Sequence, residues 1–184
     1  LCCSVLGTSY VKQPLQENPS EGAAIAVVAG SYNPPHNGHL EVLRYLSKVH
    51  RQVFVVIGVN PTKTYAVSPY VRQELLRMML REIRLENVKV HLCFSYVWKF
   101  AQEVGAAVMY RGIRSWQQDG PSEKMLEMQN WIGQRFLGKG NFIATAYIQA
   151  DPRYLGVSST LLRERLKSGQ DISDLVPPGS ALAV

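Results

Sequence analysis

Short apolar runs alternate along this chain with longer segments in which apolar residues recur every three or four positions. The runs are rich in Ala, Val and Ile and carry almost no charge, which is typical of parallel strands covered on both faces. They predict strands at residues 23–29, 53–59, 88–92, 106–110 and 142–148. The longer segments predict helices at residues 38–49, 69–83, 97–104 and 123–136, and one that starts at Val157-Ser-Ser-Thr160 and ends at Gly169.

The regular alternation of strands and helices predicts parallel β-α units. We therefore predict an α/β fold, a Rossmann-like, doubly wound, parallel five-stranded sheet with helices on both faces, for a domain that covers residues 23–178. Residues 1–22 have a loop composition and no sustained period, so we expect an irregular N-terminal extension there, with residues 179–184 as a C-terminal tail.

One helical segment carries a distinct apolar stripe. In residues 123–136, the side chains of Met125, Met128, Ile132 and Phe136 recur at helical spacing. Such a stripe usually faces a core, so we expect this one to pack inside the domain rather than to bind a cofactor.

Composition narrows the class of protein and of partner. The chain has 184 residues, 46% hydrophobic and 18% charged, which is a globular balance that disfavours disorder and a membrane span. The formal net charge of +6 is spread among acidic residues rather than gathered in a run. We therefore expect phosphorylated small molecules as partners. Nucleic acid is a weaker option, and we predict neither nucleic-acid binding nor membrane binding.

The cysteines bear on the compartment. There are three, two of them adjacent at Cys2 and Cys3, which is no disulfide framework. A reducing compartment is the simpler inference, so we expect a cytoplasmic location. The chain begins with Leu1, so its natural N-terminus is left open and the location is weakly constrained.

The first candidate site is the glycine-rich turn at residues 30–39, between the first strand and the first helix. A helix N-terminus there presents unpaired backbone N–H groups and a partial positive charge, and His36 and His39 lie one helical turn apart at that point. Pro34 and Pro35 fix the backbone before the histidines, and Gly38 leaves room for a ligand to approach. This turn predicts an anion site.

A metal site is the poorer interpretation of the two histidines. The remaining histidines, His50 and His91, have no ligand-like spacing, and no cysteine pair accompanies them. We therefore expect no dedicated metal ligands.

Three further segments follow strands or begin helices, where open α/β sheets bind ligands. Lys63 follows the second strand, Arg111 to Arg114 follow the fourth, and the hydroxyl groups of residues 158–160 precede the last helix. Each has an ordinary structural explanation, as a surface lysine, structural arginines or helix caps. Together they predict a second phosphate-binding helix end and cations close to it.

Residues 36–39 resemble the T/H-x-G-H motif of the nucleotidyltransferase superfamily, which joins a phosphate to a nucleotide and releases pyrophosphate. The whole set of motifs, from about Ala24 to Pro178, resembles the bacterial-type phosphopantetheine adenylyltransferase family. The matching segments are residues 30–34 with G-[TS]-F-D-P, 61–63 with the lysine loop, 68–72 with the segment ending in E-R, 106–114 with A-D-x-x-x-R-G-[LI]-R, 157–160 with I-S-S-S, and 171–177 with D-V-x-x-x-[VL]-P.

The resemblance implies roles for individual residues of a nucleotidyltransferase domain at residues 23–178. The implied catalytic residues are His36, His39, Lys63 and Arg114, with His39 and Lys63 on the α-phosphate of ATP. The implied ATP-binding residues are Gly30, Ser31, Tyr32, Gly38, His39, Gly112, Arg114, Ser158, Ser159 and Thr160. The implied acceptor-binding residues are Ser31, Lys63, Val97, Trp98, Arg111 and Asn130.

The implied reaction transfers AMP from ATP to 4′-phosphopantetheine and gives dephospho-coenzyme A and pyrophosphate. Mg²⁺ would accompany ATP without a dedicated protein site. The partners would be ATP and a phosphorylated small-molecule acceptor, and the resemblance leaves homo-oligomer formation open.

The sequence departs from the family in three places. His36 stands where the family usually has threonine, and the chain stops at Val184, short of the family's closing helix. The D-F-E-Y-E segment of the family corresponds to residues 119–123, where Pro121 replaces an acidic residue used near the nucleotide. That contact and the local oligomer surface are therefore in doubt.

Two other interpretations stay open. A nicotinate or nicotinamide mononucleotide adenylyltransferase is favoured by Asn33-Pro-Pro-His36 and by the Ser-Ser-Thr-x-x-Arg pattern of residues 158–163, and disfavoured by residues 110–114 and the lysine loop. A cytidylyltransferase is less favoured, since that group's signature near the end is not found. A nucleotide-binding module without catalysis is suggested by the altered residues 119–123, against which stands the retention of both histidines, Lys63 and the arginines.

Overall fold

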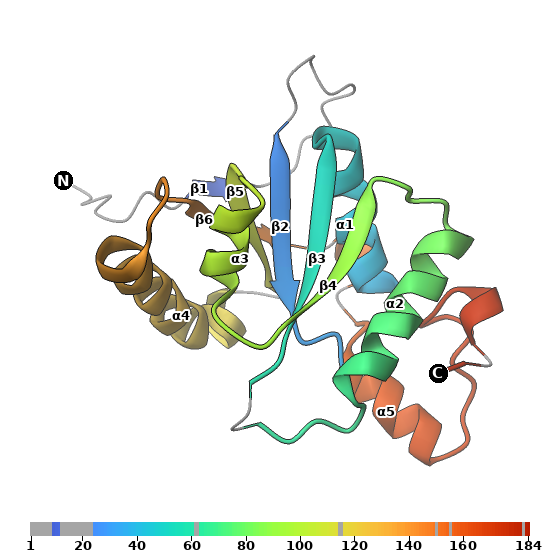
Figure 1. Ribbon diagram of the computed structural model, residues 1–184. Coiled ribbons are helices and arrows are strands. Elements are labelled where there is room, and N and C mark those ends of the chain that lie inside the picture. The colour runs from blue at the N-terminus through green and yellow to red at the C-terminus, as the bar shows by residue number, and fades with distance from the viewer. Residues whose placement is uncertain are drawn as a thin grey trace.

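A computed structural model describes residues 9–11, 24–60, 63–113, 116–149, 151–154, 156–181 and 183–184. Its centre is one parallel sheet with strand order β1-β6-β5-β2-β3-β4 (Figure 1). The strands are β1 (Ser9–Val11), β2 (Ile25–Gly30), β3 (Gln52–Gly58), β4 (Val88–Cys93), β5 (Val108–Ile113) and β6 (Ala144–Gln149). The five predicted strands are thus confirmed.

The helices cover both faces of the sheet. They are α1 (Asn37–Val49), α2 (Pro69–Glu82), α3 (Val97–Glu103), α4 (Trp116–Leu137) and α5 (Ser159–Lys167), with 3-10 turns η1 (Pro152–Tyr154) and η2 (Pro178–Ser180). One apolar core joins α1, α2 and α5 to Val28, Val55 and Ile57 of the sheet. A second core joins α3 to Val27 and Val56, whose side chains point the other way, and Figure 1 shows α1 and α3 on opposite sides of the sheet. The doubly wound architecture is therefore confirmed.

The end of α5 follows the predicted glycine cap. Gly169 has a φ of +65°, and the N–H groups of Gly169 and Gln170 donate to the carbonyls of Leu166 and Arg165. These are the two hydrogen bonds of a Schellman motif, which glycine favours because it has no Cβ.

The N-terminal extension contains a strand that the sequence pattern did not predict. Residues 9–11 form β1, which pairs with β6 in parallel, so this part of residues 1–22 is not irregular. Three residues are too few to show a period, and what forms the strand is the edge of β6, whose unpaired backbone groups need partners.

Helix α4 differs from the prediction in its start. It begins at Trp116 rather than Glu123, and it continues through Gly120 and Pro121. Glycine and proline both disfavour a helix interior, and proline removes one backbone hydrogen bond, which is why the pattern predicted a later start.

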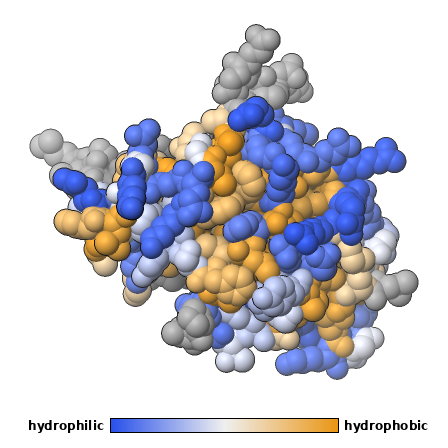
Figure 2. Space-filling model, viewed as in Figure 1, coloured by the Kyte–Doolittle hydropathy of each residue, from blue (hydrophilic) through white to orange (hydrophobic). Residues whose placement is uncertain are grey.

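The apolar stripe of α4 was predicted to be buried, and this prediction is wrong. Met125, Met128, Ile132 and Phe136 are 58%, 52%, 45% and 74% exposed. Figure 2 shows apolar surface at the end of the molecule where α4 lies, at the left of the view.

The buried side of α4 carries small and polar residues instead. Gln134 donates to the carbonyl of Ile143 (3.1 Å) and accepts from its N–H (2.8 Å), and Tyr147 donates its hydroxyl to Glu127 (3.2 Å). Gly133 lies directly against the indole of Trp98. Because these specific contacts orient the helix, its apolar stripe is turned away from the sheet. Within the described parts of the chain, no helix combines the length and apolar character needed to cross a bilayer.

The contact between Gly133 and Trp98 yields a test of this packing. A Cβ at Gly133 would lie 2.6 Å from Nε1 of Trp98, whose side chain is only 1% exposed. We expect Gly133→Val to lower the free energy of unfolding by about 1–3 kcal/mol through overpacking, measured by urea denaturation. Gly140→Val is the control, since a Cβ there meets its nearest atom at an ordinary 3.6 Å. Equal stability of both variants would contradict the packing of α4 on α3.

Candidate functional site

The glycine-rich turn at residues 30–39 follows the carboxyl end of β2, at the point where the strand order reverses. The chain adds β3 and β4 on one side of β2 and then returns to place β5 and β6 on the other. The carboxyl ends of β2 and β5 therefore flank the crevice in which open α/β sheets bind ligands.

The start of this turn is shaped by a tyrosine. The Tyr32 side chain is buried and its backbone has a φ of +46°. A Cβ at Gly30 would lie 2.9 Å from the Tyr32 ring, so glycine is required there. Burial raises the pKa of the Tyr32 hydroxyl, an effect that the positive charge of Arg111 partly offsets. The Tyr32 side chain is thus uncharged and packs beside His39, with the two ring centroids 4.8 Å apart.

The two histidines are stacked at the N-terminus of α1. Their ring centroids are 3.7 Å apart and their planes are inclined by 28°. Nδ1 of His39 accepts a hydrogen bond from the backbone N–H of His36 (3.2 Å). A neutral His39 therefore carries its proton on Nε2, which is left as a donor.

His36 is held behind His39. Its side chain is buried, and its Nδ1 meets no hydrogen-bond partner among the described residues. A Cβ at Gly38 would lie 3.2 Å from Nδ1 and Cε1 of this ring. Gly38 thus makes room for the His36 imidazole, which is a reason for the glycine that the sequence did not suggest.

Burial makes both imidazoles poor bases. It lowers the pKa of His36 to about 4, and it lowers the pKa of His39 as well, with a further contribution from the charge that His36 would carry. Both side chains are neutral at pH 7 without a ligand. An anion near them would favour the charged form and raise both pKa values.

The start of α5 meets the same turn from the other side. Ser158 caps the helix by accepting from the N–H of Leu161 (3.1 Å). Ser159 donates its hydroxyl to the carbonyl of Pro34 (2.7 Å). Arg163 donates to the carbonyl of Asn33 (2.5 Å) and to the Thr160 hydroxyl (3.2 Å). The N-termini of helices α1 and α5 therefore lie close together, on either side of the glycine-rich turn.

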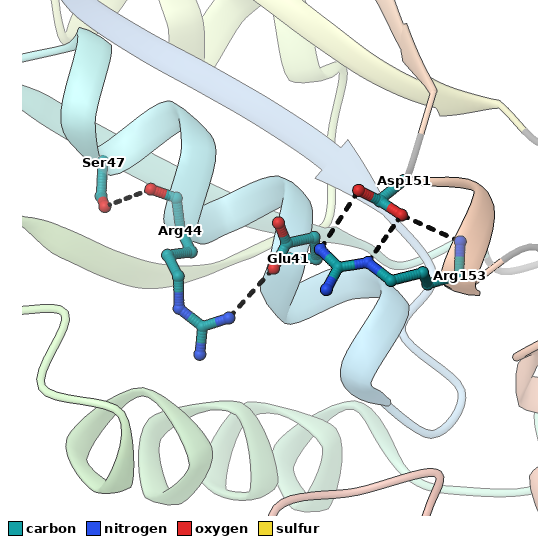
Figure 3. Close-up of polar contacts among 5 residues, drawn as sticks. All are labelled: Glu41, Arg44, Ser47, Asp151 and Arg153. Atoms are coloured by element: carbon teal, nitrogen blue, oxygen red, sulfur yellow. Dashed lines mark hydrogen bonds and ion pairs between the residues drawn. The ribbon is translucent and has the colours of Figure 1, made fainter. Parts of the chain in front are cut away.

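The segment before α5 is fixed by a short turn. Asp151 accepts from the backbone N–H and the guanidinium of Arg153 (2.9 and 3.0 Å), and its carbonyl accepts from the N–H of Tyr154 (2.8 Å). Figure 3 shows the Arg153 guanidinium between Asp151 and Glu41 of α1. This turn places Tyr154 beside Gly38, where Tyr154 Cβ would be 3.6 Å from an added Cβ.

A cleft of about 510 Å³ lies between these elements. Its lining residues are Ser31, Asn33, His36, Gly38, His39, Val42, Thr64, Tyr65, Gly112, Ile113, Tyr154, Val157, Ser158, Ser159, Thr160 and Arg163. Another hollow of about 540 Å³ lies between α2 and the opposite, amino end of β4. We assign the candidate site to the first cleft because it collects both helix N-termini and the histidines.

Eight of the predicted site residues line this cleft. They are Ser31, His36, Gly38, His39, Gly112, Ser158, Ser159 and Thr160. Gly30 and Tyr32 lie behind the lining and shape the turn. The sequence analysis named Asn33 only as part of the segment Asn33-Pro-Pro-His36, and it did not single out Tyr65 or Tyr154, since neither charge nor spacing marks them.

The predicted acceptor residues are not gathered in the same way. Lys63 is exposed, and its neighbours Thr64 and Tyr65 are the ones that line the cleft. Arg111 donates to the carbonyl of Ala29 (3.2 Å), on the neighbouring strand. Trp98 is buried in the core beside Val97.

The structure gives less detail for the last two predicted site residues, Asn130 and Arg114. Asn130 is half-buried on α4. Arg114 lies outside the described residues, and the side chains of residues 119–123 are likewise not described.

The buried His36 predicts a pH dependence of stability. The unfolded chain takes up a proton at its ordinary pKa near 6.5, whereas the folded chain does so only near pH 4. Stability should therefore be highest above pH 6.5 and fall between pH 6.5 and 4, by about 3 kcal/mol for this group. We expect His36→Thr to flatten this decline, as measured by urea denaturation across that range. The same decline in wild type and variant would show that His36 does not cause it.

Comparison with known proteins shows the family to which this fold and cleft belong. The sequence pattern of the family described as Cytidylyltransferase-like matches residues 27–165. The phosphopantetheine adenylyltransferase of Treponema pallidum (strain Nichols) is 34% identical over 152 residues, covering 83% of this chain and 90% of that protein. The phosphopantetheine adenylyltransferase of Bifidobacterium longum (strain DJO10A) is 31% identical over 153 residues, covering 83% and 87%.

A solved structure agrees with the fold. The crystal structure of a proposed nicotinate-nucleotide adenylyltransferase from Vibrio parahaemolyticus superposes with a TM-score of 0.60 at 18% identity, covering 86% of this chain and 96% of that one. At this identity the likeness concerns the fold alone. The chain belongs to the cytidylyltransferase-like family, and the relatives it matches at 31–34% identity are phosphopantetheine adenylyltransferases.

Proposed function

We propose that this chain is an adenylyltransferase that transfers AMP from ATP to 4′-phosphopantetheine, giving dephospho-coenzyme A and pyrophosphate. The observation that carries the proposal is the single cleft into which the N-termini of α1 and α5 open, with two histidines at one of them. The names of the relatives supply the acceptor.

The triphosphate of ATP would lie across the two helix ends. The first-turn N–H groups and the partial positive charge of a helix N-terminus favour negative charge. At the α1 end, the N–H groups of Asn37 and His39 already donate to the carbonyls of Leu175 and His36, so the helix charge and the histidines would act there. The hydroxyl groups of Ser158 and Thr160 would add short-range donors, and Arg163 adds a cation in the cleft lining. The Ser159 hydroxyl already donates to the carbonyl of Pro34, so it would hold the α5 end in place. Gly112, also in the lining, allows close approach of the nucleotide on the β5 side.

The chemistry would be an in-line attack of the acceptor's phosphate oxygen on the α-phosphorus of ATP, with pyrophosphate as the leaving group. Such a transfer needs positioning and charge stabilisation more than an activated nucleophile. His39 would donate from Nε2 to the α-phosphate, since its Nδ1 is already engaged by the backbone. His36, stacked behind it, would fix the plane of that ring.

Lys63, Arg114, Arg111, Val97 and Asn130 complete the proposed site on the acceptor side. Lys63 would bridge the acceptor phosphate and the α-phosphate, and Arg111 would face the acceptor phosphate. Trp98 would support this part of the site from behind, because its indole is buried.

Magnesium would enter with the triphosphate. Within the described residues no three His, Cys, Asp or Glu side chains form a cluster that could hold a metal ion. The ion would neutralise charge on the β- and γ-phosphates, and the residues of the chain would position the α-phosphate. A cytoplasmic location stays a prediction from the cysteine pattern.

A nicotinate or nicotinamide mononucleotide adenylyltransferase is the alternative. Two sequence segments favour it, residues 33–36 and 158–163. They are joined by a hydrogen bond from the Arg163 guanidinium to the carbonyl of Asn33. Because either acceptor presents a phosphate, the nucleotide half of the site fits both.

Pyrophosphate release distinguishes the acceptors. With ATP, we expect turnover with 4′-phosphopantetheine and little with nicotinate mononucleotide, and CTP should not replace ATP. Preferred turnover with nicotinate mononucleotide would support the alternative. Tight ATP binding without pyrophosphate release on any of these acceptors would indicate a binding module.

His39 should carry a large part of the rate. We expect His39→Ala to remain folded and to lower kcat by about 10²- to 10³-fold, because removing one anion-stabilising donor costs roughly 2–4 kcal/mol in the transition state. His91→Ala is the matched control, since His91 stacks on Phe100, away from the cleft. Unchanged kcat in His39→Ala would remove the histidine from the mechanism.

We also propose that the chain self-associates through α4. Its exposed stripe has the spacing with which one helix packs against another, and the stripe is turned away from its own sheet. A second copy related by a two-fold axis would place the same stripe against itself, which is the commonest way to close an interface.

Sedimentation velocity tests the α4 interface. We expect the wild type to sediment as an oligomer and Ile132→Glu to shift it toward monomer, because a carboxylate would have to be buried in the interface. Leu166→Glu on α5 is the control, since Leu166 is 38% exposed and Ile132 is 45% exposed. A monomeric wild type would contradict the proposal.

A further inference from the structure

Arg72, in the first turns of α2, is a fully buried charged residue that the proposed chemistry does not use. Its side chain is 0% exposed, although it belongs to a residue type that is rarely buried without a partner. The acceptors it meets in the described chain are backbone carbonyls rather than carboxylates. A buried, uncompensated cation is costly, and an apolar side chain would pack the position more simply.

The contacts of Arg72 join two segments that line the nucleotide cleft. Nη1 donates to the carbonyl of Ser31 (2.6 Å), in the turn that follows β2. Nε donates to the carbonyl of Ser68 (3.4 Å), the residue that caps α2. The guanidinium carbon lies 4.3 Å from the ring centroid of Tyr65. Ser31 and Tyr65 are both in the cleft lining.

The same two segments are joined a second time nearby. The backbone N–H of Val67 donates to Oδ1 of Asn33 (3.0 Å). Lys63 is two residues before Tyr65, on the same segment. The distance between Ser31 and the segment that carries Lys63 is therefore set by Arg72 on one side and Asn33 on the other.

The Arg72 guanidinium also retains an unused donor. Nη2 is buried and has no partner among the described residues. Burial lowers the pKa of Arg72, an effect that Tyr65 partly offsets, and arginine stays charged because its ordinary pKa is so high. Among the described residues, the guanidinium contacts backbone carbonyls and the Tyr65 ring, so this charge lies next to two residues of the cleft lining.

We propose that Arg72 is a positioning residue that holds the glycine-rich turn and the Lys63 segment at the spacing needed for transfer. This inference rests on the proposed function of the cleft. ATP would still be held by the α5 end and by His39, which do not touch Arg72. Loss of Arg72 should therefore act on the rate more than on the affinity for ATP.

Two variants of Arg72 and one control test the inference. Arg72→Met removes the charge and both hydrogen bonds, and Arg72→Lys keeps the charge without the planar, two-sided contact. Arg77→Met is the matched control, because Arg77 lies on the same helix but is exposed and paired with Glu74. We expect kcat to fall by about 10²-fold in Arg72→Met and about tenfold in Arg72→Lys, the size expected for misplaced reacting groups. The dissociation constant for ATP, measured by calorimetry, should stay within about threefold of wild type, and Arg77→Met should match wild type throughout.

A second readout does not depend on the acceptor. Acetylation of Lys63 by an N-hydroxysuccinimide ester, followed by mass spectrometry, should be strongly reduced by ATP in the wild type and in Arg77→Met. ATP should give much weaker protection in both Arg72 variants. If Arg72→Met does not fold, Arg72→Lys carries the test.

The outcomes separate the two proposals. Wild-type kcat and full ATP protection of Lys63 in the Arg72 variants would overturn the positioning role while leaving the transferase intact. If ATP protects Lys63 in the wild type but pyrophosphate is not released with any acceptor, the proposed function alone would be overturned. Loss of stability with normal kcat of the folded protein would show that Arg72 serves the fold only, and would also overturn the inference.

Discussion

The contact between the start of α5 and the turn after β2 is the constraint on which the rest of the site depends. Ser159 donates to the carbonyl of Pro34, and Arg163 donates to the carbonyl of Asn33. These bonds bring together two helix N-termini that are more than a hundred residues apart in sequence. Each end alone would be a generic anion site, because any helix leaves its first N–H groups unpaired. Joined, they form one cleft with donors on both sides.

The stacked pair of His36 and His39 gives the cleft its chemical character. Burial keeps His36 and His39 neutral, and the backbone fixes the tautomer of His39. A neutral imidazole with its proton on Nε2 is a donor that adds no charge until an anion arrives. The ligand then supplies the charge that favours protonation, so the site can respond to the phosphate it binds.

Two features of the molecule conflict with its simplest packing, and we propose a functional consequence for each. Arg72 is a cation where an apolar residue would fit, and it spans two segments of the cleft wall. Helix α4 turns its apolar stripe outward because Gly133, Gln134 and Glu127 fit the sheet and α3 more closely. In each case specific polar contacts take precedence over the burial of apolar side chains.

The sequence by itself determined the fold class, the order of the strands and helices along the chain, and the two helix ends that we propose as the anion site. Strand runs and helical periods depend on local spacing, so the five strands and the cap at Gly169 could be predicted from neighbouring residues. Strand β1, the earlier start of α4 and the exposure of Met128 and Ile132 could not, because they depend on what a distant segment offers as a partner. The same holds for the burial of Arg72, because its guanidinium donates to the carbonyl of Ser31 in another part of the chain. Only tertiary structure decides which charges are buried and which hydrogen bonds close, since both require segments that the sequence keeps apart.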